Sequence, residues 1–254
     1  MSVLNCLTLV VIAFGLEVID ASFGMGYGTI LTPALLLVGY DASQVVPAVI
    51  ASQLVGDFLA VFFHHRFRNV DFTVRSNHFE VGMMLAAFSL VGSVVAVLFA
   101  LKLSKFALNL YIGVLVFIVG IMVLASRQRE RDFSWLRLLF LGSIASFNKG
   151  LSGGGYGPVV TAGQILTGVD VRAAIGITCL AEGVACISGL TAYIWVGKQI
   201  DWLLASMLAI GVALSTPVAA LIVKKMETKH LKAIIGVLTV AMGVLTVLKT
   251  VRVL

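Results

Sequence analysis

The chain has 254 residues, of which 60% are hydrophobic and only 12% are charged, about half the charged share of soluble domains. A soluble protein of this composition could not cover its surface with polar groups, so the sequence indicates an integral membrane protein with several spans. The net charge of +6 does not indicate nucleic-acid binding. The basic residues instead gather in short polar stretches between apolar segments, as they do in cytoplasmic loops.

Ten apolar segments separated by polar breaks make up the chain, and we expect all of them to be helical. Most approach the roughly 20 residues that a helix needs to cross the hydrocarbon core. Two are shorter, because Tyr27–Val38 and Tyr156–Thr167 hold twelve residues each and directly follow glycine clusters. We expect neither to cross the membrane fully. In chain order the segments cover residues 3–20, 27–39, 45–63, 79–101, 106–125, 134–147, 156–168, 171–196, 202–223 and 231–250.

The glycine clusters of the two short segments fall in register when the chain is shifted by 129 residues. GMGYG (24–28) then aligns with GGGYG (153–157), and eight of the eighteen pairs over positions 24–41 are identical. The sequence therefore predicts an internal duplication. Each half is a broken, re-entrant short helix pair followed by three long transmembrane helices. We place the first repeat at 1–126, a cytoplasmic linker at 127–133 and the second repeat at 134–254.

The distribution of lysine and arginine favours repeats of opposite orientation. If each short pair is a hairpin that returns to its starting face, twelve basic loop residues lie on one face of the membrane and five on the other. If each pair is one broken helix, the repeats are parallel and the split is ten to seven. Because cytoplasmic loops carry the excess of basic residues, we expect an all-α protein with two inverted repeats.

The N-terminus, the cysteines and the interfacial histidines are expected to have no role in the chemistry. No lysine or arginine precedes Arg66, so we expect no cleaved signal peptide. All three cysteines lie in apolar segments, and we expect them to pack as small apolar residues without a disulfide: Cys6, Cys179 and Cys186. Three histidines at segment ends are expected at the membrane interface rather than on a metal: His64, His65 and His78.

The glycine clusters interrupt the backbone inside the membrane. Irregular backbone survives there only where protein or a water-filled cavity surrounds it. A helix that starts after such a cluster points its free N–H groups and its positive dipole end at the break. Two half-helices that meet from opposite sides would form an anion site near the midplane. We expect the substrate to contact Gly26, Tyr27, Gly28 and Gln53 in the first half and Asn148, Lys149, Ser152, Gly153, Gly154, Gly155, Tyr156 and Gly157 in the second.

Lys149 is the residue that most directly indicates an anion. A lysine at the centre of the membrane costs roughly 2.5–3.5 kcal/mol on insertion scales, so an intramembrane lysine is a candidate functional residue. Asn148 and Ser152 lie beside it and can donate hydrogen bonds. The alternative is that Lys149 reaches the interface from a surface loop.

Acidic residues inside the apolar segments are candidates for ion coupling. They are Glu17, Asp20, Asp57 and Glu182. The first two share a helical face before the first break, and Gln53, which shares a face with Asp57, corresponds to Glu182 in the repeat. Asp57 or Glu182 can carry a proton coupled to transport, with Na⁺ as the other candidate ion. The alternative is a structural ion pair between Asp20 and Lys149.

Other functions fit the pattern less well. The glycine–tyrosine–glycine sequences are similar to potassium-channel filters, but Lys149 would repel a cation and no Thr-Val precedes either copy. An anion channel remains an alternative. Nucleotide binding is not expected, because the glycine clusters have no βαβ context. We also expect no enzyme, metal or cofactor, because the sequence shows neither a nucleophile paired with a base nor a metal-binding motif.

The duplicated pattern resembles the sulfite exporter TauE/SafE family, also called the toluene-sulfonate uptake permeases. The resemblance rests on the chain length, the two related halves and a GGGYG-like break before a short helix that ends near a G-x-D turn (GYD at 39–41, GVD at 168–170). The first copy departs from this pattern because it has Met25 where the second copy has Gly154. The resemblance implies a secondary transporter of a small sulfur-containing anion, such as sulfite, thiosulfate or an organosulfonate, in the bacterial cytoplasmic membrane. Its partners would be this substrate and membrane lipids. A carrier of another small organic anion, such as a carboxylate, is the alternative.

Overall fold

A computed structural model describes residues 3–100, 105–125, 134–138, 140, 156–195, 197 and 199–252. These residues form helices and no strand, which confirms the all-α prediction. The predicted linker 127–133 and most of the segment 134–147 lie outside the described residues. The helices are α1 (Val3–Phe23), α2 (Tyr27–Leu37), α3 (Ala42–Arg66), α4 (Asn77–Ala100), α5 (Lys105–Ala125), α7 (Tyr156–Leu166), α8 (Val171–Trp195), α9 (Trp202–Lys225) and α10 (Thr228–Arg252).

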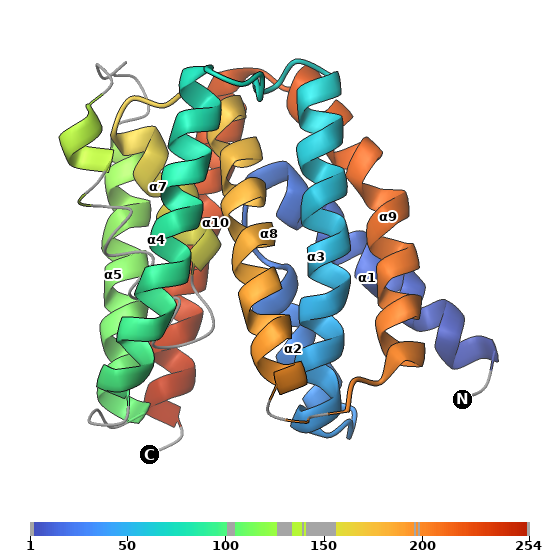
Figure 1. Cartoon of the computed structure of the whole chain (residues 1–254). Coiled ribbons are helices and arrows are strands. Elements are labelled where there is room, and N and C mark those ends of the chain that lie inside the picture. The colour runs from blue at the N-terminus through green and yellow to red at the C-terminus, as the bar shows by residue number, and fades with distance from the viewer. Residues whose placement is uncertain are drawn as a thin grey trace.

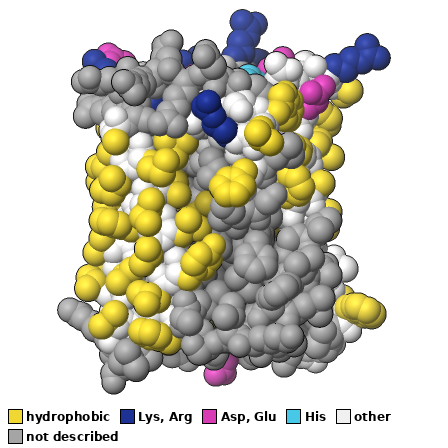
Figure 2. Space-filling model, turned by 90° about the vertical axis from the view of Figure 1, so that its left-hand side faces the viewer, with side chains coloured by type: hydrophobic (Ala, Val, Ile, Leu, Met, Phe, Trp, Pro, Cys, Tyr) yellow, Lys and Arg dark blue, Asp and Glu magenta, His cyan; other side chains and the backbone are white. Residues whose placement is uncertain are grey.

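The surface of the helix bundle is that of a multi-pass membrane protein. Five helices in the described part of the chain are long and apolar enough to span a membrane: α1, α3, α8, α9 and α10. Large apolar side chains face outward along them, including Phe62 on α3 and Leu245 on α10. Figure 2 shows hydrophobic side chains over the described middle of the molecule and most Lys and Arg side chains near its upper end. Lipid is the solvent that this surface requires.

The helix lengths agree with the predicted duplication, with one difference. Helices α2 and α7 have 11 residues each, too few to cross the hydrocarbon core, and each is followed along the described chain by longer helices. Helix α1, however, has 21 residues and is one of the five spans. Only the second member of the first pair is therefore short, because α1 continues past Asp20 until a glycine ends it.

The packing of the helices is consistent with inverted repeats. Figure 1 shows α3 and α8 side by side and running in opposite directions, as do α5 and α10. Helix α3 packs on α9, and the corresponding pair in the other half, α8 and α4, also packs together. One apolar core cluster joins α1, α2, α3 and α9, and another joins α4, α5, α7, α8 and α10.

One end of the bundle carries most of the described basic loop residues. The end of α3, the start of α4 and the start of α8 meet there, because Arg66, His78 and Asp170 line one hollow. The end of α9 lies at the same end, since the Arg172 guanidinium donates to the carbonyl of Met226 at 2.9 Å. This grouping is the one expected for inverted repeats, and the positive-inside rule assigns this end to the cytoplasm.

Candidate functional site

The first glycine break forms where the sequence predicts it. Helix α1 ends at Phe23 because Gly24 takes a φ of 73°, and the Gly24 amide closes the last turn on the carbonyl of Asp20 at 2.6 Å. Gly26 has a φ of 132°, and α2 then starts at Tyr27. Positive φ at these two positions favours glycine. The local sequence therefore predicts the position of the break.

The start of α2 binds a carboxylate of its own chain. The backbone N–H of Tyr27 donates to Asp20 Oδ1 at 2.9 Å, and the Asp20 side chain is buried. A helix N-terminus favours a negative group at this position, so this carboxylate stands where an oxygen of a bound anion could stand. One of the amides that the sequence analysis assigns to the substrate is thus occupied by Asp20.

The start of α7 packs directly on this first break. A β-carbon at Gly157 would overlap the carbonyl oxygen of Gly24 and lie 3.1 Å from Met25 Cα. The hydroxyl of Thr161, one turn further along α7, donates to the same carbonyl oxygen at 3.1 Å. The absence of a side chain at Gly157 therefore lets two segments more than 120 residues apart meet backbone to backbone.

The remainder of the second predicted half-site lies outside the described residues. This holds for Asn148, Lys149, Ser152, Gly153, Gly154 and Gly155. Tyr156 begins α7, but its side chain is likewise not described. The contact of α7 with the first break is therefore carried by Gly157 and Thr161.

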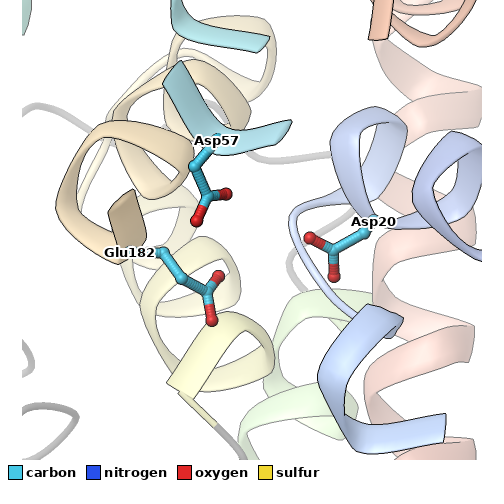
Figure 3. Close-up of side chains that lie close together, drawn as sticks. All are labelled: Asp20, Asp57 and Glu182. Atoms are coloured by element: carbon cyan, nitrogen blue, oxygen red, sulfur yellow. The ribbon is translucent and has the colours of Figure 1, made fainter. Parts of the chain in front are cut away.

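Three of the predicted acidic residues converge beside this contact. Asp20 comes from α1, Asp57 from α3 and Glu182 from α8, and one carboxylate oxygen of each lies within 4.8 Å of the others. Figure 3 shows the three carboxylates directed toward one another. Such a cluster can hold a proton or a hard cation, because carboxylate oxygens are the ligands that such ions prefer.

Glu17 and Gln53 extend this buried polar region. Glu17 is 1% exposed, its Oε1 lies 2.8 Å from the position of a β-carbon at Gly56, and its Oε2 has no hydrogen-bond partner within the described ranges. The Oε1 of Gln53 lies 3.3 Å from the position of a β-carbon at Gly28. The polar residues selected from the sequence in the first half therefore all face the interior near the first break.

Cys186 makes a polar contact that was not predicted from the sequence. Its thiol donates to Asp57 Oδ2 at 3.8 Å, so this cysteine is more than an apolar packing residue. Gly183 makes this approach possible, since a β-carbon there would lie 3.1 Å from Asp57 Cβ. The alignment of the two halves by 129 residues could have predicted this contact, because it pairs Asp57 with Cys186. As expected, Cys6, Cys179 and Cys186 are free thiols.

Tyr27 and His64 are also more deeply placed than their sequence positions suggest. The Tyr27 side chain is fully buried, and its hydroxyl shares a 2.8 Å hydrogen bond with Ser52 Oγ. His64 lies at the end of α3 as expected, but the expectation that it faces the membrane interface is wrong. Its side chain is fully buried, donates from Nε2 to the carbonyl of Ala21 at 2.9 Å and accepts from Asn69 Nδ2 at 3.0 Å.

Comparison with known proteins shows which family the chain matches. The family model described as "Sulfite exporter TauE/SafE" matches residues 9–246. The chain is 25% identical over 245 residues to the "Probable membrane transporter protein YtnM" of Bacillus subtilis (strain 168), in an alignment that covers 90% of this chain and 79% of that relative. No solved structure gives a significant match. The family match spans both glycine breaks and all the acidic residues described above.

Proposed function

Because the chain belongs to the sulfite exporter TauE/SafE family, we propose that it is a secondary transporter of a small sulfur-containing anion. Sulfite, thiosulfate and organosulfonates are the candidate substrates. The relative from Bacillus subtilis is itself named only as a probable membrane transporter. The membrane-spanning helices and the family together place this chain among membrane transporters, and the substrate is our proposal.

The observation that carries the proposal is the contact between the start of α7 and the first break. Thr161 and Gly157 lie against the carbonyl of Gly24, so the N-terminal ends of α2 and α7 belong to one region. In the proposed site, the amides around Gly26–Gly28 and Gly153–Gly157 donate to the substrate oxygens. Lys149 would supply positive charge, and Asn148 and Ser152 would supply further donors.

Asp20 gives this site a way to couple the anion to a cation. Its carboxylate accepts the Tyr27 amide, so it competes with any substrate oxygen for that donor. Binding of a proton or of Na⁺ at Asp20 would weaken this hydrogen bond and release the amide. The anion and the coupling ion would then bind together.

The carboxylate cluster also explains why an anion would not enter alone. Two unit charges 4.8 Å apart repel each other by about 3–4 kcal/mol at an effective dielectric constant of 20. An arriving anion would add to this repulsion unless a cation compensates the cluster. The candidate cations are a proton, Na⁺ and the amine of Lys149. Coupled transport fits this requirement better than an open anion channel does.

Uptake by the purified protein in proteoliposomes tests the proposal. We expect saturable uptake of sulfite or thiosulfate that responds to a proton or sodium gradient. Lys149→Ala should abolish it without changing membrane insertion, and Lys249→Ala, near the end of α10, is the matched control. Undiminished uptake by the Lys149 variant would exclude the proposed role of this lysine.

A ligand screen and an electrical recording separate the alternatives. Thermal unfolding in detergent with sulfite, thiosulfate, sulfonates and carboxylates identifies the ligand class, since a ligand of the folded state raises its apparent stability. A carboxylate that stabilises the protein more than any sulfur-containing anion would contradict the proposed substrate. Unitary currents in planar bilayers would indicate a channel instead of a transporter.

A further inference from the structure

A hollow of about 650 Å³ opens at the basic end of the bundle, and its lining residues do not include those described at the glycine breaks. It lies between the end of α3, the loop from α3 to α4 and the start of α8. We call it the basic hollow and define it by His65, Arg66, Arg68, Asp71, His78 and Asp170, which all line it. We propose that the basic hollow is a second anion site, which binds a small tetrahedral oxyanion at the cytoplasmic end of the protein.

Two histidines of the basic hollow are held as hydrogen-bond donors. The Phe72 amide donates to His65 Nδ1, and the Asp71 amide donates to His78 Nδ1, each at 3.1 Å. In a neutral imidazole, a ring nitrogen that accepts leaves the proton on the other nitrogen. Each ring therefore carries its N–H on Nε2. The loop backbone fixes this tautomer in both rings, so both can donate to a ligand.

The two arginines add permanent positive charge. Within the described ranges, neither Arg66 nor Arg68 forms an ion pair or a side-chain hydrogen bond. Arg68 has a φ of 62°, a conformation that is unfavourable for a residue with a side chain. Guanidinium groups present several donors in one plane, which suits the oxygens of sulfate-like and phosphate-like anions.

The two aspartates of the basic hollow are largely engaged by the backbone. Asp71 Oδ1 accepts from the Thr73 amide at 2.9 Å, and Asp170 Oδ2 accepts from the amides of Arg172 and Ala173 at 3.0 and 3.2 Å. These bonds shape the loop and the start of α8. The backbone amides compensate part of the charge of these two carboxylates and occupy part of their acceptor capacity. Two guanidinium groups and two imidazole N–H groups line the same hollow, so hydrogen-bond donors outnumber the acceptors that are left, which suits an oxyanion.

A chain of hydrogen bonds connects the basic hollow to the first break. Asn69 lines the hollow and donates to His64 Nδ1 at 3.0 Å, and His64 donates to the carbonyl of Ala21 at 2.9 Å. Ala21 directly follows Asp20, a member of the central carboxylate cluster. An anion in the hollow therefore lies at one end of a chain of hydrogen bonds that reaches the residue next to Asp20, whether or not the transported substrate is the same anion.

Two sources of the oxyanion are possible, and both present the same chemistry. One is a free oxyanion from solution, and the other is the phosphate of an anionic lipid headgroup. Both would place negatively charged oxygens among the donors of the basic hollow. The experiment below therefore uses inorganic sulfate as the probe and varies the lipid.

A fluorophore beside the basic hollow reports binding there without a signal from the central site. Val74 is 78% exposed in the same loop, so Val74→Cys in a Cys6→Ser background is the labelling position, since Cys179 and Cys186 are buried. The full-length labelled protein in phosphatidylcholine nanodiscs is titrated with sodium sulfate. We expect a saturable fluorescence change. Arg66→Gln combined with Arg68→Asn should raise the half-saturating concentration about ten-fold or more, because charged hydrogen bonds are lost.

Arg75→Asn is the matched control for this experiment. Arg75 lies in the same loop and also has a positive φ, 84°, but it does not line the basic hollow. The half-saturating sulfate concentration of this variant should stay within about two-fold of the parent value, since an exposed charge that does not line the hollow contributes little. Thermal unfolding of each variant checks that the fold is intact, and Arg66→Lys with Arg68→Lys should retain part of the binding.

The lipid arm identifies the source of the oxyanion. If phosphatidylglycerol in the nanodiscs competes with sulfate, the headgroup phosphate occupies the basic hollow; if it does not, the site takes free oxyanions. Either result supports the proposal. An unchanged half-saturating concentration in the Arg66/Arg68 variant would overturn it, as would a sulfate response that is lost equally in Arg75→Asn. A saturable response to Mg²⁺ in place of sulfate would show a cation site instead.

Discussion

Replacing Gly157 by alanine tests the contact on which the proposed substrate site depends. The new β-carbon would overlap the carbonyl oxygen of Gly24 and lie 3.1 Å from Met25 Cα. Both neighbours are backbone atoms, which cannot rotate away as a side chain can. Helix α7 must therefore move away from the first break. Overpacking of this kind costs about 1–3 kcal/mol, while the better helix propensity of alanine returns at most about 1 kcal/mol.

Gly28→Ala is the control, because the 129-residue shift aligns Gly28 with Gly157 and both are the second residues of their helices. Among the described residues outside its own helix, the one atom found within 4 Å of its added β-carbon is Gln53 Oε1, at 3.3 Å. This atom is the end of a flexible side chain, which can shift by a few tenths of an ångström. The chemical change is identical in the two variants, and only the neighbouring atoms differ.

Thermal unfolding in detergent and sulfite uptake into proteoliposomes measure the two consequences. The net loss of about 1–2 kcal/mol in Gly157→Ala corresponds to a transition roughly 2–8 °C lower. Uptake should fall about ten-fold or more, because displacements of this order disturb a preorganised site. Gly28→Ala should unfold within about 1 kcal/mol of the parent protein, and it serves as the control for stability alone because Gly28 itself belongs to the proposed substrate site. Parent-like stability and uptake in Gly157→Ala would refute the close contact of the two breaks.

Four further predictions concern the polar residues. Glu182→Gln should abolish stimulation of uptake by a pH gradient, and full retention of that stimulation would remove its proton role. Asp20→Ala should lower stability by about 0.5–2 kcal/mol through loss of the cap on α2, whereas Asp20→Asn keeps an acceptor and should unfold nearly as the parent does. Tyr27→Phe should cost about 1 kcal/mol through its lost hydrogen bond to Ser52 but leave uptake unchanged, which checks that the ring packs rather than binds substrate. A backbone hydrogen bond holds the pKa of Asp71 below its usual range, so its contribution to the loop is present above pH of about 3.9 and is lost as the pH falls through the folded value; lower protection factors in this loop near pH 3 than near pH 5, with exchange rates normalised to the intrinsic rate at each pH, would show it.

The fold was largely accessible from the sequence because its signals are local. Glycine positions give the break at 24–26, since positive φ is needed at Gly24 and Gly26. The lengths of the apolar runs give the spans, and the register of the two glycine clusters gives the duplication. The extra turn of α1 was missed because the charge of Asp20 looked like the end of a membrane helix. In the fold this carboxylate instead serves as a cap for α2.

The contacts within the site were harder to predict because they join distant segments. In a membrane protein both the lipid-facing and the buried faces of a helix are apolar, so the sequence pattern does not separate them. The burial of His64 depends on Ala21 and Asn69, which lie on different segments. The contact of Cys186 with Asp57 depends on how closely α3 and α8 cross at Gly183. The residues next to His64 and Cys186 in the sequence predict neither contact, because each depends on how separate helices pack.

The duplication explains why the acidic residues form one cluster. Each of these four acids aligns with a residue that is not acidic in the other half of the chain. The partners under the 129-residue shift are Ser146 for Glu17, Lys149 for Asp20, Cys186 for Asp57 and Gln53 for Glu182. Had both copies kept their carboxylates, twice as many would surround the pseudo-twofold axis that the predicted inverted repeats imply. Each additional pair at the observed separation would add about 3–4 kcal/mol of repulsion at an effective dielectric constant of 20.

This difference between the halves separates two tasks that a symmetric site would have to combine. Both predicted repeats contain a glycine cluster, so the sequence offers the backbone donors that suit an anion twice. The carboxylates are present once, so a compensating cation has one place to bind. We infer that anion recognition belongs to the pair of breaks and ion coupling to the single acidic cluster. Asp20 connects the two, because it belongs to the cluster and also accepts an amide of the first break.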